Sequence, residues 1–331
     1  DSVQFENISC FGNGDGWIQA YGSGGTGELN YILLPVNDTN NTGYFGNLQA
    51  GTYSVAITDL NFCPDVVSGD ITIIEPAELT ITSENATDML CHDSDDGTIE
   101  VTATGGTGIL TYTLNPTGTS NNTGLFTGLS TGTYNVDVTD EKGCSASSSD
   151  LIINAPAELI FDNISNLDVS CHGLTDGSIT ASGSGGTGAI EYTLTPGNIS
   201  NSTGYFNNLP GGTYQVTITD ANNCSLTSSD IIVIEPDEVL IDNIDYTDIS
   251  CHGADDGSIT VTASGGTGIL SYNLQPVDIT NNTGVFTNLG GGTYTVTVTD
   301  QNNCGPAISA DIIITDPPAL VIDSETATNS T

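Results

Sequence analysis

Apolar and polar residues alternate along many short stretches of this chain. Residues 98–104, for example, read Thr-Ile-Glu-Val-Thr-Ala-Thr, and residues 110–114 and 134–139 alternate in the same way. Gly, Asn and Asp separate these stretches. Short period-two runs divided by turn residues predict antiparallel strands with one buried face, the pattern of a β-sandwich. We find no stretch with a convincing helical periodicity.

The pattern returns four times. The eight Cys residues form four pairs whose members are 53 positions apart, and the pairs recur at intervals of 81, 80 and 80. Such self-similarity identifies a tandem repeat. We therefore predict an all-β protein of four tandem Ig-like β-sandwich domains in an end-to-end rod. The predicted ranges are 1–75, 76–155, 156–235 and 236–316, followed by a tail, 317–331, equivalent to the first strand of a further repeat.

Two recurrent motifs indicate local structure. Gly-Thr-Tyr places a Tyr at the start of the penultimate strand, which suits a tyrosine corner with an inward ring and a hydroxyl that caps a connection. Gly-Gly-Thr-Gly joins two strands and is interpreted as a hairpin turn. The four Tyr are Tyr53, Tyr134, Tyr214 and Tyr294.

Composition excludes several functions. The chain has 41 acidic residues, one basic residue, Lys142, and a formal net charge of −40. It cannot neutralise phosphates, so nucleic-acid binding and phosphate-clamp chemistry are excluded, and an anionic membrane would repel it. With 37% hydrophobic and 13% charged residues, disorder is not expected. No apolar run predicts membrane insertion, and no signal segment opens the sequence.

Each repeat carries one Cys pair, so we predict disulfides within repeats. A domain of this size has a thin core, and closing such a loop would stabilise it by about 4 kcal/mol. Disulfides imply an oxidising, extracellular or cell-surface location. Zinc is the alternative, but His92, His172 and His252 supply at most one His per repeat. The predicted bonds are Cys10–Cys63, Cys91–Cys144, Cys171–Cys224 and Cys251–Cys304.

No catalytic or cofactor motif emerges, and we predict that the chain is not an enzyme. An Asp precedes Gly at one position of each repeat, where a turn is the favoured interpretation. Ca²⁺ binding is the alternative, although the spacing is not that of an EF-hand. These weak Ca²⁺ candidates are Asp15, Asp96, Asp176 and Asp256.

Glycosylation sequons are frequent. Four of them hold one repeat position in the motif Asn-(Asn/Ser)-Thr-Gly, namely Asn40, Asn121, Asn201 and Asn281. Glycans there would lie on the surface. Chance is the alternative in a chain so rich in Asn, Ser and Thr. The weaker candidates are Asn7, Asn37, Asn85, Asn163, Asn198 and Asn329.

The repeat resembles a known family. In the fourth repeat, residues 251–268 read Cys-His-Gly-Ala-Asp-Asp-Gly-Ser-Ile-Thr-Val-Thr-Ala-Ser-Gly-Gly-Thr-Gly, and Gly-Thr-Tyr begins a second motif that ends at Cys304. This is similar to the SprB repeat of very large Bacteroidota surface proteins, including gliding-motility adhesins. The resemblance covers all four repeats and implies an Ig-like extracellular module in long tandem arrays, exported by the type IX system. The first repeat departs most, with Trp17 and Tyr21.

The ends of the sequence overlap in register. Residues 317–331 align with 156–170, and residues 1–9 align with 162–170, so the tail repeats the start of a repeat while the first repeat lacks six residues. A piece of a longer array is one explanation. Head-to-tail polymerisation is the other, in which the tail adds as a strand to the first repeat of the next copy. The assembly residues would be Ala319, Leu320, Val321, Ile322 and Asp323.

These observations favour a structural subunit of an extracellular, glycosylated filament or surface rod. Its partners would be copies of itself or further repeats of the same chain. The alternative is an adhesin stalk or binding array that recognises glycans or surfaces, with or without Ca²⁺. Only Trp17 and Tyr21 hint at such a binding surface.

Overall fold

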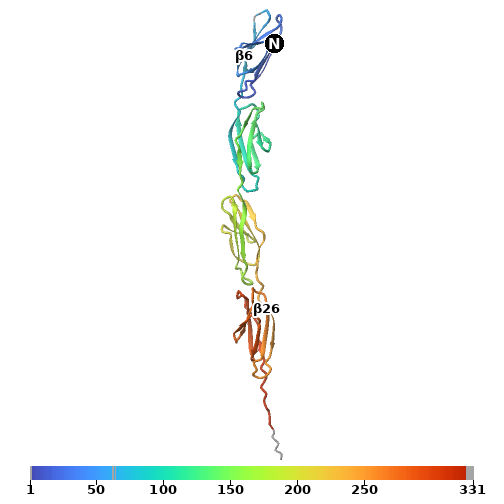
Figure 1. Cartoon of the computed structure of the whole chain (residues 1–331), viewed down its shortest axis with the longest axis vertical. Coiled ribbons are helices and arrows are strands. Elements are labelled where there is room, and N and C mark those ends of the chain that lie inside the picture. The colour runs from blue at the N-terminus through green and yellow to red at the C-terminus, as the bar shows by residue number, and fades with distance from the viewer. Residues whose placement is uncertain (1, 62, 64, 326–331) are drawn as a thin grey trace, which may run out of the picture. The chain divides into compact units, whose positions relative to one another are not determined.

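The computed structural model describes residues 2–61, 63 and 65–325. Every regular element in this part of the chain is a β-strand (Figure 1). None of the described residues form a helix that could cross a membrane. The chain divides into two compact units, Asp1–Ala157 and Glu158–Thr331, and each contains two repeats.

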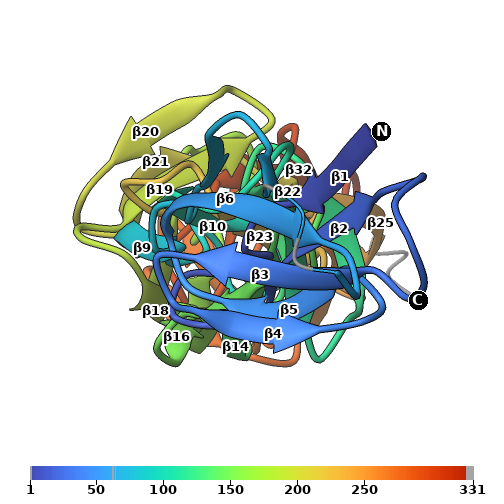
Figure 2. The ribbon, with the colours of Figure 1, turned by 90° about the horizontal axis from the view of Figure 1, so that it is seen from above.

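Each repeat consists of a three-stranded and a five-stranded antiparallel sheet. In the first repeat the smaller sheet has the order β1-β2-β5, and the larger has the order β4-β3-β6-β7 with β8 also paired to β6. Figure 2 shows β6, β3 and β4 as neighbouring strands. The bounds are β1 (Ser2–Glu6), β2 (Gly16–Tyr21), β3 (Asn30–Leu34), β4 (Asp38–Asn40), β5 (Tyr44–Leu48), β6 (Gly51–Thr58), β7 (Val66–Val67) and β8 (Ile71–Ile73).

The other three repeats have the same order of strands. In the second they are β9 (Thr80–Thr87), β10 (Gly97–Thr104), β11 (Thr111–Asn115), β12 (Thr119–Asn121), β13 (Leu125–Leu129), β14 (Gly132–Thr139), β15 (Ser145–Ser147) and β16 (Leu151–Ile153). In the third they are β17 (Ala157–Leu167), β18 (Gly177–Gly186), β19 (Glu191–Thr195), β20 (Ile199–Asn201), β21 (Tyr205–Leu209), β22 (Gly212–Thr219), β23 (Ser225–Thr227) and β24 (Ile231–Val233). In the fourth they are β25 (Leu240–Thr247), β26 (Gly257–Ser264), β27 (Ser271–Gln275), β28 (Ile279–Asn281), β29 (Val285–Leu289), β30 (Gly292–Thr299), β31 (Ala307–Ile308) and β32 (Ile312–Ile314).

The two sheets of a repeat pack face to face around one core. In the second repeat, Ile99 and Val101 of β10 meet Leu114 of β11 and Val136 and Val138 of β14, all buried. Alternation along each strand places these side chains on one face and the intervening Thr and Asp residues on the other. A separate core of the same kind lies in each of the other repeats. The predicted all-β sandwich fold is confirmed.

The tyrosine corner is also confirmed. Each Tyr is buried, and its hydroxyl donates to the backbone carbonyl four residues earlier, as Tyr134 does to Ser130 at 3.1 Å. The same bond joins Tyr53 to Gln49, Tyr214 to Pro210 and Tyr294 to Gly290. It ties the start of the long strand to the connection that precedes it.

The hairpin interpretation of Gly-Gly-Thr-Gly is wrong. In the second repeat this motif connects β10 to β11, and these strands belong to different sheets. Gly105, Gly106 and Gly108 all have positive φ, which a side chain would disfavour. The motif therefore carries the chain across the end of the sandwich, where it can contact the neighbouring elements.

Candidate functional site at the ends of the repeats

The two Cys residues of one repeat lie at opposite ends of its sandwich. Cys10 lies in the turn before β2, and Gly16, the first residue of β2, faces Ile73 of β8, which pairs with the start of β6. Cys63 follows the other end of β6. A strand rises about 3.3 Å per residue, so the eight residues of β6 hold the two ends roughly 25 Å apart. A disulfide needs Cα atoms within about 7 Å of each other.

The disulfides instead join different repeats. Cys10 of the first repeat is bonded to Cys144 of the second, with Cα atoms 5.6 Å apart. Cys171 of the third is bonded to Cys304 of the fourth, with Cα atoms 5.4 Å apart. Cys91 and Cys224 are disulfide-bonded as well. Among the described residues Cys63 and Cys251 are free and exposed.

All four predicted disulfide pairs are therefore wrong. The predicted Cys10–Cys63 and Cys91–Cys144 bonds are replaced by Cys10–Cys144, and the predicted Cys171–Cys224 and Cys251–Cys304 bonds by Cys171–Cys304. The physical reason is the length of the long strand between the two ends. Following strand direction along one repeat would have revealed it, because β2 and β6 begin at the same end of the sandwich, and the first Cys precedes β2 whereas the second follows β6.

A buried Asp fixes the second Cys of each repeat. Asp140 accepts hydrogen bonds at Oδ1 from the backbone N–H groups of Lys142 and Cys144, and at Oδ2 from Thr107. Burial alone raises the pKa of Asp140, but the hydrogen bonds from Thr107 and Cys144 outweigh it and hold the pKa below its usual value. Asp59, Asp220 and Asp300 make the corresponding bonds to Cys63, Cys224 and Cys304.

A second Asp shapes the loop that carries the first Cys. Asp15 accepts from the backbone N–H and the hydroxyl of Ser9, and Asp256 does the same for Ser250. The serine bonds hold the pKa of both carboxyls below the usual value. The turn interpretation of these residues agrees with this geometry, which Asp176 also shares. The described residues contain no cluster of three or more metal-ligating side chains, and Ca²⁺ binding stays a prediction.

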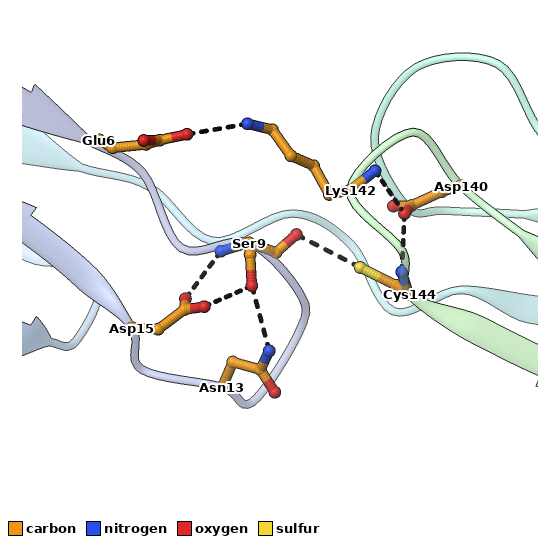
Figure 3. A network of polar contacts seen from close by, with 7 residues as sticks. All are labelled: Glu6, Ser9, Asn13, Asp15, Asp140, Lys142 and Cys144. Carbon is orange, nitrogen blue, oxygen red and sulfur yellow. Dashed lines mark hydrogen bonds and ion pairs between the residues drawn. The ribbon is translucent and has the colours of Figure 1, made fainter.

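Polar contacts accompany the disulfide between the first two repeats (Figure 3). Lys142, the one basic residue of the sequence, pairs with Glu6 at 2.9 Å, and Ser9 O lies 3.3 Å from Cys144 Sγ. Between the third and fourth repeats, Asn302 takes the place of Lys142 and donates to Ser170 O at 2.8 Å. The two junctions therefore have one geometry with different side chains.

The His residues hold the chain as it leaves a repeat. His92 Nδ1 lies 3.0 Å from Pro156 O, His172 Nδ1 lies 3.2 Å from Pro236 O, and His252 Nδ1 lies 3.0 Å from Pro317 O. Sequence reasoning considered these His only as zinc ligands and missed this role. Their fixed distance from the following Pro was the signal that could have found it.

The chain then enters the following repeat and contributes to its core. Leu79, Leu159 and Val239 stand at equivalent positions and are only 8%, 8% and 6% exposed. The backbone just before them passes close to Gly-Gly-Thr-Gly. A Cβ on Gly105 would lie 1.9 Å from Glu78 O, and one on Gly265 would lie 1.9 Å from Glu238 O. Glycine is required there by this close approach.

The first repeat has an open groove in this place. Gly24 corresponds to Gly105, yet a Cβ on Gly24 would meet no described atom within 4 Å. The groove has a volume of about 470 Å³, and its lining includes Val3, Leu29, Ile57 and the free Cys63. It therefore combines an apolar floor with an unused thiol.

The tail exposes apolar side chains, which complement the apolar lining of this groove. Leu320, Val321 and Ile322 are 103%, 76% and 78% exposed. No strand forms within its described part, 317–325, and residues 326–331, including Asn329, lie outside the described residues. The tail leaves the fourth repeat past His252, as the linkers leave the second and third repeats past their His. The predicted strand addition by Ala319–Asp323 stays a prediction.

The four recurrent sequons have a structural role. Asn121 Oδ1 accepts from the N–H groups of Thr123 and Gly124, and its Nδ2 donates to Leu125 O. Gly124 has a φ of +73°, and a Cβ there would lie 2.0 Å from Val101 O. Asn40, Asn201 and Asn281 form the same turn. The turn explains why the motif recurs, and its glycosylation stays a prediction.

An aromatic face distinguishes the first repeat. Trp17 and Tyr21 alternate with the buried Ile18 and Ala20 along β2, so they lie on the outer face of the sheet. The ring of Trp17 is 6.2 Å from that of Tyr44 on β5. The other repeats have Thr98, Ser178 and Ser258 in place of Trp17.

The fold and the junctions define a tandem Ig-like repeat protein with disulfides between consecutive domains. The family model of the SprB repeat matches residues 83–119, 167–199 and 243–278, which lie in the second, third and fourth repeats. The resemblance deduced from the sequence is confirmed. The repeats and the disulfides indicate an extracellular or cell-surface protein.

Solved structures with a similar fold share little sequence. The FN1–FN3 domains of chicken CNTN1 are 12% identical, with 72% of this chain and 98% of that chain covered and a TM-score of 0.28. Domains 1–6 of the surface layer protein SbsC are 11% identical, with 95% and 53% covered and a TM-score of 0.26. The eight N-terminal Ig domains of Down Syndrome Cell Adhesion Molecule are 7% identical, with 87% and 56% covered and a TM-score of 0.25. Comparison with curated proteins found no match.

Proposed function

We propose that this chain is the subunit of an extracellular filament or stalk that assembles head to tail, and that it acts mechanically and not as an enzyme. In each assembly step, Ala319–Asp323 of one copy adds as a strand to the first repeat of the next copy. The observation that carries the proposal is the groove of the first repeat beside Gly24, together with the exposed apolar tail. Tandem sandwiches of this kind are typical of structural surface proteins.

The register of the added strand follows from the other repeats. Leu320 corresponds to the buried Leu79, Leu159 and Val239, whereas Val321 corresponds to Thr80, Ile160 and Leu240, all exposed. Leu320 would therefore enter the groove and Val321 would face the solvent. Burying one Leu side chain contributes about 1.5–3 kcal/mol. Backbone hydrogen bonds along the edge of β2 would fix the register of the added strand.

The proposed contact is heterologous, because it joins two different surfaces. Groove and tail are different surfaces at opposite ends of the sequence, so one copy can use both at once. A heterologous interface of this type extends into a fibre or closes as a ring according to its rotation. The high negative charge keeps neighbouring assemblies apart in solution, and salt screens this repulsion.

Deletion of residues 317–331 tests the proposal. Full-length and shortened chains would be compared by sedimentation velocity and by electron microscopy of the same samples under reducing conditions. We expect filaments or longer species from the full chain and monomers from the shortened chain. Filaments from the shortened chain, or a full chain that stays monomeric at high concentration, would show that the tail does not fill the groove.

A second candidate function is glycan recognition by the first repeat, because Trp17, Tyr21 and Tyr44 form its aromatic outer face. Aromatic rings offer an apolar surface for the CH groups of a sugar, and neighbouring polar groups such as Gln19 supply hydrogen bonds. Binding to immobilised polysaccharides would be measured for Trp17→Ala. Tyr246→Ala, which removes an exposed ring from the fourth repeat, is the matched control. Equal loss in both variants, or none in Trp17→Ala, would reject this function.

A further inference from the structure

The disulfides follow one rule in both places where the partners are seen. The first Cys of a repeat is bonded to the second Cys of the next repeat, as in Cys10–Cys144 and Cys171–Cys304. Cys251 is the first Cys of the fourth repeat, and Cys63 is the second Cys of the first repeat. Among the described residues, Cys251 and Cys63 are both free and exposed. Under this rule Cys63 of a second copy would supply the partner of Cys251, and Cys251 of another copy would supply the partner of Cys63.

We infer that head-to-tail assembly is sealed by a covalent bond, a disulfide between Cys251 of one copy and Cys63 of the next. The inference rests on the strand addition proposed above. It adds a covalent step, after which dilution no longer dissociates the assembly.

Cys63 is held as its bonded counterparts are. Its backbone N–H donates to Asp59 Oδ1 at 3.0 Å, compared with 2.8 Å from Cys144 to Asp140 and 2.8 Å from Cys304 to Asp300. Asp59 also accepts from Thr26, as Asp140 does from Thr107. The thiol also lines the groove that receives the added strand. Strand entry and bond formation therefore take place at one end of the same repeat.

Cys251 is likewise held as its bonded counterparts are. Ser250 N–H donates to Asp256 Oδ1 at 2.9 Å, compared with 2.8 Å from Ser9 to Asp15 and 3.0 Å from Ser170 to Asp176. His252 fixes the start of the tail at Pro317 O, next to this Cys in sequence. The thiol and the donated strand therefore leave the fourth repeat side by side, as the bonded Cys and the linker do at the internal junctions.

The reaction needs an oxidant, which we take to be a small-molecule disulfide. The Cys251 thiolate attacks this disulfide and releases one of its thiols, which forms a mixed disulfide on Cys251. The Cys63 thiolate of the next copy then attacks the Cys251 sulfur and releases the second thiol. The two protein thiols lose two protons and two electrons in total, and the oxidant becomes two thiols. Strand addition supplies the proximity that makes the second attack effectively intramolecular.

Single Cys variants test the bond and its direction. Full-length wild type, Cys63→Ser and Cys251→Ser would each be incubated with a mixture of oxidised and reduced glutathione and analysed on non-reducing gels. We expect a ladder of covalent multimers from wild type and monomers from each variant. An equimolar mixture of the two variants retains one thiol of each kind and is expected to form dimers and nothing larger. Peptic peptides from the ladder, prepared at acid pH to prevent exchange, should link Cys251 to Cys63.

The remaining outcomes separate the two proposals. Filaments from a Cys63→Ser/Cys251→Ser double variant, with a wild type that forms no covalent ladder, would overturn the disulfide and leave strand addition standing. A ladder linked through Cys251 to Cys63 that persists in Leu320→Asp would uphold the disulfide and overturn strand addition. Dimers from either single variant alone would show pairing of like cysteines and overturn the inference.

Discussion

The Cα atoms of Cys10 and Cys144 lie 5.6 Å apart although 134 positions of sequence separate them. The bond joins the end of one sandwich to the beginning of the next, beside the linker and the ion pair between Lys142 and Glu6. One chain segment, one disulfide and one ion pair therefore connect the domains. A pulling force along the chain would therefore be carried by this disulfide as well as by the linker.

The bond between Cys10 and Cys144 should make a large contribution to thermal stability. Closing a loop that spans 134 positions stabilises the folded state by about 5 kcal/mol in the chain-entropy model. We expect Cys10→Ser/Cys144→Ser to lower the melting temperature of the first unit in calorimetry. Cys63→Ser is the control and should leave it unchanged. A Cys10–Cys63 peptide in a non-reducing digest would contradict the structure.

The register of the tail predicts opposite effects for two adjacent residues. Leu320→Asp places a charge in the apolar groove of the next copy and should weaken assembly by at least roughly 100-fold. Val321→Asp places the same charge on the exposed face and should change assembly by less than about threefold. Sedimentation equilibrium under reducing conditions measures both. Equal effects of the two substitutions would show that the strand does not bind in this register.

The groove can be blocked from the other side. A Cβ on Gly24 would lie where backbone passes Gly105 and Gly265, so Gly24→Ala should prevent strand addition. Gly118→Ala is the matched control, because Gly118 also has a positive φ, 74° against 88°, and also has no neighbouring atom within 4 Å. Both variants carry the same backbone strain. Assembly should be lost in Gly24→Ala and kept in Gly118→Ala, and the reverse result would place the contact elsewhere.

The turn at Asn121 should be needed whether or not it carries a glycan. Asn121→Ala removes the hydrogen bonds to Thr123, Gly124 and Leu125, so the free energy of unfolding should fall by about 1–3 kcal/mol. Protein from a host without glycosylation isolates this effect. Asn85→Ala, at an exposed sequon of the same repeat, should change stability by less than about 0.5 kcal/mol. Denaturant titration measures the stability of both variants. If neither variant loses stability, the motif at Asn121 acts only through its glycan.

The bond between Ser250 and Asp256 predicts a pH dependence. Because it holds the pKa of Asp256 below its unfolded value, its contribution is complete above the unfolded pKa of about 3.9 and is lost as pH falls through the folded pKa. Protonation also relieves repulsion among the many carboxyls, so the useful quantity is the difference between wild type and Ser250→Ala. That difference in melting temperature should be constant above about pH 5 and shrink toward acid pH. A difference that grew in acid would contradict this assignment.

Periodicity was sufficient to predict much of the fold. Alternation through Ile99 and Val101 predicted a buried strand face, and Gly-Thr-Tyr predicted the tyrosine corner at Tyr134, because both depend on local spacing. The hairpin at Gly105–Gly108 was wrongly predicted because a Gly-rich turn can return within a sheet or cross to the facing sheet. The packing of the two sheets decides between these two paths of the chain. The local sequence alone does not predict this packing.

The sequence by itself determined the four repeats, the sandwich class, the SprB resemblance and the acidic surface, since each follows from residue type and period. Only the tertiary structure decided the Cys partners, the role of the His residues and the groove beside Gly24. The physical reason is that a strand of eight residues carries its two ends far apart in space. The two Cys residues of one repeat therefore lie at opposite ends of the sandwich. The partner of Cys10 is Cys144 of the next domain.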